Sequence, residues 1–254
     1  MTGAPRVNYT HKKMTADELW PKLLKHDADK DIMACSSPAG SDKTTDATGL
    51  VQGHAFTLMG AKLMSNGVRM LTIRNPWGSE KYHGNWSDKD SRWTPALKAE
   101  AGMKADMDDG IFHMAIEDFM TLFSESSANF NTENMHYDYF LKLDDSTPPV
   151  GDLTSHDLTI VSTADQDVYV TAHTWDKRGL SDKCKNLAKY SEFKTPADYM
   201  QFSGSFTSTW TMKADDKSIV TVSHDFSNKD LASDWSVVAW GSKAPVYVYA
   251  NNGA

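Results

Sequence analysis

Two stretches of sequence, Gly49-Leu50-Val51-Gln52-Gly53-His54-Ala55-Phe56 and Ile73-Arg74-Asn75-Pro76-Trp77-Gly78, decide how the first half of this chain folds. They overlap the apolar runs Val51 to Met59 and Val68 to Ile73, which predict two buried strands. Asn66-Gly67, between the runs, is typical of a hairpin turn. We therefore expect a β-hairpin here.

A helix is predicted shortly before this hairpin. Thr15 and Glu18 have the spacing of a capping box, in which each side chain satisfies a backbone donor of the first turn. Pro21 lacks an N–H group, so we expect this helix to bend or to begin late. Other patterns predict a strand at Met33-Ala34-Cys35-Ser36, helices near Ala96 to Met103 and Ile116 to Phe123, and a strand from Tyr137 to Leu143.

The pattern of the sequence changes after Pro148-Pro149, which we take as a domain boundary. The segments beyond it are short, rich in β-branched and aromatic residues, and separated by turn residues, which favours an antiparallel β-sandwich. The predicted fold class is α+β and β-rich, with a linker or tail at 1–14, a first domain at 15–145 and a second at 150–254. The predicted strands of the second domain are Leu158 to Ser162, Val168 to Thr174, Phe206 to Met212, Ser218 to Val222, Trp235 to Trp240 and Val246 to Ala250.

Composition excludes several classes of protein. The formal net charge of −8 opposes a general affinity for nucleic acid, which needs a surplus of cationic side chains on one face. No apolar run is long enough to span a membrane and the N-terminus has no signal-peptide core, so we expect a cytoplasmic protein without a transmembrane segment. Cys35 and Cys184 are far apart in sequence, and we expect both to be free thiols.

The residue types of the two opening motifs indicate a chemistry. In a cysteine protease, a histidine takes the thiol proton while an asparagine amide bonds the far ring nitrogen and orients the ring. A nearby tryptophan can shield that hydrogen bond from water. His54, Asn75 and Trp77 suit these three roles, although a lone histidine or an Asn-Pro pair is usually structural.

The two motifs together resemble the second protease subdomain of the calpains. Further landmarks of that subdomain follow in the same order, and the resemblance weakens after Phe123. It implies a papain-like second protease subdomain followed by a C2-like β-sandwich. The later landmarks are Gly84-Asn85-Trp86-Ser87-Asp88, Ser91-Arg92-Trp93, Asp109-Gly110-Ile111-Phe112 and Glu117-Asp118-Phe119.

The sequence departs from the calpain pattern in its nucleophile. Calpains carry it in an N-terminal subdomain, in a Gly-Asp-Cys-Trp type motif that is not found here. Neither Cys35 nor Cys184 stands in such a motif, so we expect the chain to be inactive alone and to need a cysteine-bearing subdomain to cleave protein substrates. The alternative is a non-catalytic scaffold with cytoskeletal or other partners.

The resemblance also implies a calcium site, formed by Asp88, Asp109 and the carbonyl of Ile111. Lys81 stands where the calpain loop offers a glutamate, and an ammonium group removes one oxygen ligand and repels the cation. We therefore favour a loop without a cofactor, in which Lys81 neutralises the two carboxylates, and Ca²⁺ binding at this site is the alternative. A β-sandwich calcium sensor is the weakest hypothesis. The run containing Asp106 and Asp108 is predicted to be solvated surface.

The second domain is rich in aromatic residues. Aromatics on strands usually serve core and cross-strand packing rather than ligand binding, and we expect this role here. The residues concerned are Tyr169, Trp175, Trp210, Trp235, Trp240, Tyr247 and Tyr249.

Overall fold

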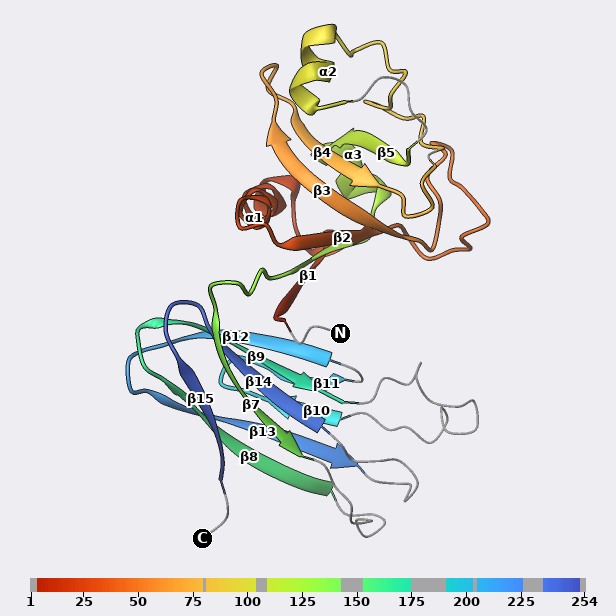
Figure 1. Ribbon diagram of the computed structural model, residues 1–254. Helices are drawn as coiled ribbons and strands as arrows, with labels where there is room; N and C mark the ends of the chain where they lie inside the picture. The colour runs from red at the N-terminus through yellow and green to blue at the C-terminus, as the bar shows by residue number, and fades with distance from the viewer. Residues whose placement is uncertain are drawn as a thin grey trace. The chain divides into compact units, whose positions relative to one another are not determined.

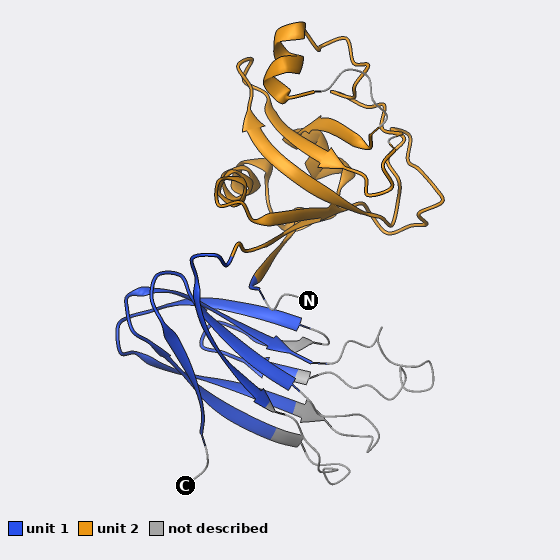
Figure 2. Ribbon diagram, in the orientation of Figure 1, with its two compact units in different colours: residues 1–5, 132–254 blue, residues 6–131 orange. Residues whose placement is uncertain are grey.

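The computed structural model describes residues 4–79, 81–103, 109–142, 153–174, 191–202, 205–225 and 235–251. The chain forms two compact units (Figure 2). Arg6–Asn131 is the N-terminal unit, and Thr132–Ala254 together with Met1–Pro5 is the sandwich unit. None of the helices in the described ranges combines the length and the apolar character needed to cross a membrane.

The N-terminal unit is built on a six-stranded sheet whose strand pairs are all antiparallel (Figure 1). The order across the sheet is β1-β6-β2-β3-β4-β5. Its strands are β1 (Arg6–Thr10), β2 (Ile32–Ser36), β3 (Ala55–Leu63), β4 (Arg69–Arg74), β5 (Ile111–Ala115) and β6 (Glu125–Asn129). Its helices are α1 (Ala16–Ala28), α2 (Pro95–Ala101) and α3 (Ile116–Leu122), with a short 3-10 turn at His11–Lys13.

The predicted hairpin is β3–β4, and its turn is where the sequence places it. Gly67 has a φ of 85°, which favours glycine, and its N–H group donates to the Met64 carbonyl at 2.8 Å. The first strand begins at Ala55 rather than at Val51. Gly53 turns the chain there with a φ of 59°, so Val51 forms only an isolated bridge with Thr45.

Helix α1 confirms the predicted capping box. The Glu18 N–H group donates to Thr15 Oγ1 at 3.3 Å, and the Thr15 N–H group donates to the Glu18 carboxylate at 2.7 Å. The helix begins at Ala16 and continues through Pro21, so the predicted late start is wrong. Pro21 removes only one hydrogen bond of the helix, and the burial of Leu19 and Leu23 compensates for it.

Alternation along the strands gives the sheet two apolar faces. On β4, Leu71 and Ile73 belong to the main core, which also contains residues of α1 and α3. Met70, on the opposite side of the same strand, belongs to a smaller core with Trp86, Trp93 and other residues. The Gly- and Trp-rich segment after β4 and helix α2 pack their apolar side chains into this smaller core.

The sandwich unit contains two antiparallel sheets, as predicted (Figure 1). One has the order β11-β10-β13-β8-β15 and the other β12-β9-β14-β7. Inward-facing residues of both sheets, such as Ile160 and Val222 from one and Val170 and Val237 from the other, share one core. The strands are β7 (His136–Lys142), β8 (Leu153–Ser162), β9 (Gln166–His173), β10 (Ser191–Lys194), β11 (Tyr199–Phe202), β12 (Ser205–Met212), β13 (Lys217–Asp225), β14 (Trp235–Gly241) and β15 (Val246–Ala250).

The two boundaries predicted from sequence differ from those of the structure. The segment taken as a tail at 1–14 contains β1, which pairs with β6 at the edge of the N-terminal sheet. The strand assigned to the first domain, β7, pairs with β14 in the sandwich, so the units divide at Thr132. Pro148-Pro149 lies outside the described residues, as do Cys184, Asp106, Asp108 and Trp175.

The predicted core role holds for only some of the sandwich aromatics. Trp235 and Trp240 are buried, but Tyr247 and Tyr249 are 42% and 54% exposed. The valines of β15 face the core, and strand alternation therefore places its tyrosines outside.

Candidate active site

Ser37 fixes the backbone of His54 at the entrance to β3. Its hydroxyl accepts from the His54 N–H group at 3.1 Å, and its own N–H group donates to the His54 carbonyl at 3.0 Å. Gly53, just before, donates its N–H to the Pro38 carbonyl at 2.8 Å. The histidine therefore sits on backbone that is bonded on both sides.

The His54 ring bonds the side chain of Asn75, which follows β4. The distance from His54 Nε2 to Asn75 Oδ1 is 3.0 Å. The Trp77 N–H group, which can only donate, also points at Asn75 Oδ1, at 3.1 Å. This second bond identifies the amide oxygen, so His54 Nε2 must carry the proton of its bond.

The position of that proton determines the chemistry of the ring. A neutral imidazole with its proton on Nε2 has a lone pair on Nδ1. Within the described part of the chain, His54 Nδ1 has no hydrogen-bond partner. His54 can therefore accept a proton at Nδ1 while Asn75 holds the opposite side of the ring.

Two aromatic rings contact the imidazole of His54. The Trp77 ring lies 4.3 Å from the His54 ring between centroids, at 48°, and the Phe56 ring meets it edge-on at 4.8 Å. Trp77 is 52% exposed while Asn75 is only 3% exposed. The half-exposed Trp77 thus lies against the ring that bonds the buried Asn75.

Asn75 is itself anchored to the start of β5. Its N–H group donates to the Gly110 carbonyl at 2.8 Å, and its carbonyl accepts from the Gly78 N–H group at 3.0 Å. Gly110 has a φ of 79°, and a Cβ there would lie 2.8 Å from the Asn75 carbonyl oxygen. A glycine is required for this close approach.

Cys35 has no part in this arrangement. It lies on β2, is 2% exposed, and belongs to the main core. Burial raises the pKa of the Cys35 thiol well above its usual value, so the thiolate that would act as a nucleophile is suppressed.

The residues predicted for calcium come together only in part. Asp88, Asp109 and Ile111 line one cavity, and Asp109 Oδ1 accepts from the Ile111 N–H group at 2.9 Å. Lys81 is exposed and forms no ion pair within the described residues, so the predicted neutralisation of Asp88 and Asp109 is not found.

Calcium prefers six to eight oxygen ligands, and the described residues present two carboxylates and one candidate carbonyl. No cluster of three or more His, Cys, Asp or Glu residues suited to a metal ion exists within the described ranges.

Sequence reasoning missed three residues that matter to these sites. Ser37 positions His54, Gly110 anchors Asn75, and His113 lines the cavity beside Asp109. Only Gly110 carried a signal, because it lies in one of the recognised motifs. The contacts of Ser37 and His113 depend on strand register, which short sequence patterns do not reveal.

An imidazole bonded through one nitrogen to a buried asparagine amide is the arrangement that thiol proteases use to orient their histidine. Residues 1–128 match the family described as "Calpain family cysteine protease", which is half of the 254-residue chain. The chain belongs to the calpain family of cysteine proteases.

Curated relatives agree with this family. The calpain-type cysteine protease DEK1 of Arabidopsis thaliana is 33% identical over 111 residues, covering 43% of this chain and 5% of the relative. Human calpain-14 is 34% identical over 109 residues, covering 41% and 16%. The bovine calpain-1 catalytic subunit is 33% identical over 132 residues, covering 48% and 18%. The matched part is thus less than a fifth of each of these relatives.

Proposed function

We propose that this chain is the histidine and asparagine portion of a calpain-type cysteine endopeptidase, whose nucleophilic cysteine comes from a segment outside this sequence. The observation that carries the proposal is the 3.0 Å bond from His54 Nε2 to Asn75 Oδ1, which leaves Nδ1 as the proton acceptor. Without the added cysteine, the chain is inactive, because Cys35 is buried in the main core and Cys184 stands in no nucleophile motif.

The proposed reaction uses three residues of this chain. His54 Nδ1 takes the proton of the incoming thiol, and the thiolate attacks the carbonyl carbon of an extended protein substrate. The same imidazolium then gives its proton to the leaving amine as the peptide bond breaks. Asn75 keeps the ring oriented and stabilises the cation, while Trp77 limits the access of water to their bond.

The proposal also covers the location, the second domain and the partners of the protein. We place the protein in the cytoplasm, with a β-sandwich of the C2-like kind as its second domain. Its partners are the cysteine-bearing subdomain and a protein substrate, and it uses no calcium ion at Asp88 and Asp109, because Lys81 replaces an acidic ligand.

The test is turnover of a fluorogenic calpain peptide by the chain alone and by the chain mixed with a separately produced calpain subdomain that carries the cysteine, each with and without Ca²⁺. We expect turnover only in the mixture. It should be lost in His54→Ala and kept in His136→Ala, because His136 is an exposed histidine of the sandwich unit.

Each other outcome has a definite meaning. Turnover by the chain alone that is lost in His54→Ala would show that a nucleophile is already present. Turnover in the mixture that survives His54→Ala would exclude the assigned base. If the mixture shows no turnover although circular dichroism shows that the chain is folded, the alternative of a non-catalytic scaffold would be favoured.

A further inference from the structure

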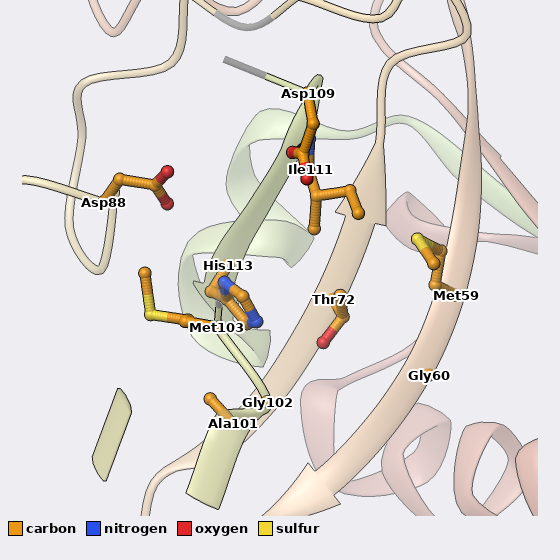
Figure 3. Close-up of a pocket in the computed structure, with 10 residues that line it drawn as sticks. All are labelled: Met59, Gly60, Thr72, Asp88, Ala101, Gly102, Met103, Asp109, Ile111 and His113. Carbon is orange, nitrogen blue, oxygen red and sulfur yellow. The ribbon is translucent and has the colours of Figure 1, made fainter. Parts of the chain in front are cut away.

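A cavity of about 330 Å³ lies in the N-terminal unit, between strands β3, β4 and β5 and the three residues Ala101, Gly102 and Met103 at the end of α2 (Figure 3). Pockets that bind small molecules typically begin at about 300 Å³. The sheet supplies Met59, Thr72, Ile111 and His113, and Met103 lies beyond the end of α2. The cavity is therefore large enough for a small organic ligand.

A β-bulge shapes the sheet side of this cavity. The register of β3 against β4 shifts between Leu58 and Gly60, so Met59 is an extra residue, and both Met59 and Gly60 line the cavity. Across the sheet, Gly60 pairs with Thr72 and Thr72 pairs with His113. These three residues form one row, and its glycine contributes no side chain, which leaves space.

His113 is a buried polar group without a protein partner. Its side chain is 3% exposed, and neither ring nitrogen has a hydrogen bond within the described structure. The Ala101 backbone lies close without completing such a bond. Figure 3 shows the ring at the cavity, and the ring meets Trp93 edge-on at 5.5 Å. Buried polar groups are normally satisfied, so an unmatched imidazole at a cavity indicates a missing partner.

The other buried histidines of this unit show the contrast. His11 bonds the Phe123 carbonyl at 2.8 Å and the Ser126 hydroxyl at 3.2 Å. His26 bonds Tyr9 at 2.7 Å and Asp31 at 2.6 Å. The fold therefore satisfies both nitrogens of its other buried histidines, and leaves His113 open where it meets the cavity.

The remaining walls indicate the charge and shape of the ligand. Asp88 and Asp109 both border the cavity, and their carboxylates favour a cation. Asp109 is held by the Ile111 N–H group at 2.9 Å. The thioethers of Met59 and Met103 pack well against flat aromatic rings. A neutral imidazole adds one donor and one acceptor.

We propose that this cavity binds a small organic ammonium compound with a flat aromatic body. Its ammonium group lies at Asp88 and Asp109, its ring lies between Met59 and Met103, and a ring N–H group donates to the open nitrogen of His113. Water filling a polar cavity is the competing explanation for the open nitrogens.

The probe we would use is tryptamine, which has both the ammonium group and the ring N–H donor. Two analogues each lack one feature: tryptophol replaces the ammonium by a hydroxyl, and 1-methyltryptamine blocks the ring N–H. Binding to the full chain is followed by the ¹³C-methyl signals of Met59 and Met103 and by the ¹⁵N signals of His113. We expect saturable shifts with tryptamine and about tenfold weaker binding of each analogue.

Variants test the same contacts from the protein side. His113→Phe keeps a ring against Trp93 but removes both nitrogens, and Asp109→Asn removes one charge; each should weaken tryptamine binding about tenfold. Asp42→Asn, at an exposed acidic residue, is the control and should change nothing. Equal binding of the three compounds, or no methyl shift at millimolar tryptamine, would overturn the proposal and leave a water-filled cavity. The comparison of the three compounds uses the unaltered chain, so it tests the proposed binding even if a variant folds poorly.

Discussion

Replacing Asn75 by alanine tests whether its amide sets the state of the His54 ring. The amide oxygen accepts from His54 Nε2 at 3.0 Å and from the Trp77 N–H group at 3.1 Å, and Asn75 is 3% exposed. A buried hydrogen-bond donor that loses its acceptor destabilises the folded state by about 1–3 kcal/mol. Both bonds are only partly buried, so we expect a total loss of about 1–3 kcal/mol in unfolding free energy.

Two measurements check this expectation. Denaturation by urea gives the loss of stability, and ¹⁵N NMR reports which nitrogen of His54 holds the proton. Asn75→Ala should shift the neutral ring from the Nε2–H form toward a mixture, whereas Asn75→Asp retains an acceptor and should keep the Nε2–H form. A loss below about 1 kcal/mol together with an unchanged Nε2–H form in Asn75→Ala would refute our assignment of the ring.

Three further predictions concern the N-terminal unit. Gly53→Ala should lower the free energy of unfolding by more than about 2 kcal/mol, because a Cβ there would lie 2.3 Å from the Gly40 carbonyl oxygen. Gly67→Ala should lower it by only about 1 kcal/mol, because a Cβ there would have no atom within 4 Å. Urea denaturation measures both losses. His113→Phe should stabilise the fold by about 1 kcal/mol in the same assay, by removing unsatisfied nitrogens. Burial lowers the pKa of His11 and His113 from 6.5, so the unfolded state takes up protons before the folded state does as the pH drops. The free energy of unfolding should therefore fall as the pH drops below about 6.5, and it should fall less steeply in His113→Phe. A flat profile from about pH 7 to 5 would contradict this.

The elements with strong local signals were predictable from sequence. The capping box of Thr15 and Glu18 and the turn at Asn66-Gly67 are set by residues within a few positions of each other. Six of the sandwich strands, β8, β9, β12, β13, β14 and β15, were also predictable, because their β-branched and aromatic runs are bounded by turn residues, whereas the four-residue strands β10 and β11 were not predicted. The side chains of His54 and Asn75 were paired by the roles that thiol-protease chemistry needs and by a family resemblance, and their distance comes from the structure.

The features that sequence patterns did not predict depend on partners distant in sequence. Strand β1 is short and mostly polar, and it becomes a strand only through its pairing with β6. Strand β7 was recognised, but only its register with β14 shows to which unit it belongs. The cavity at His113 requires a bulge in β3 and contacts across three strands, none of which leaves a periodic pattern in the sequence.

The anchoring of His54 and Asn75 has a consequence for how a complete protease site would be assembled. Both side chains are fixed within a single unit, by Ser37 on one side and by Trp77 and Gly110 on the other. Their conformational entropy is lost when this unit folds, before any cysteine arrives. Under the proposed function, assembly therefore requires no rearrangement of the proton acceptor, and the arrival of the thiol alone decides when catalysis starts.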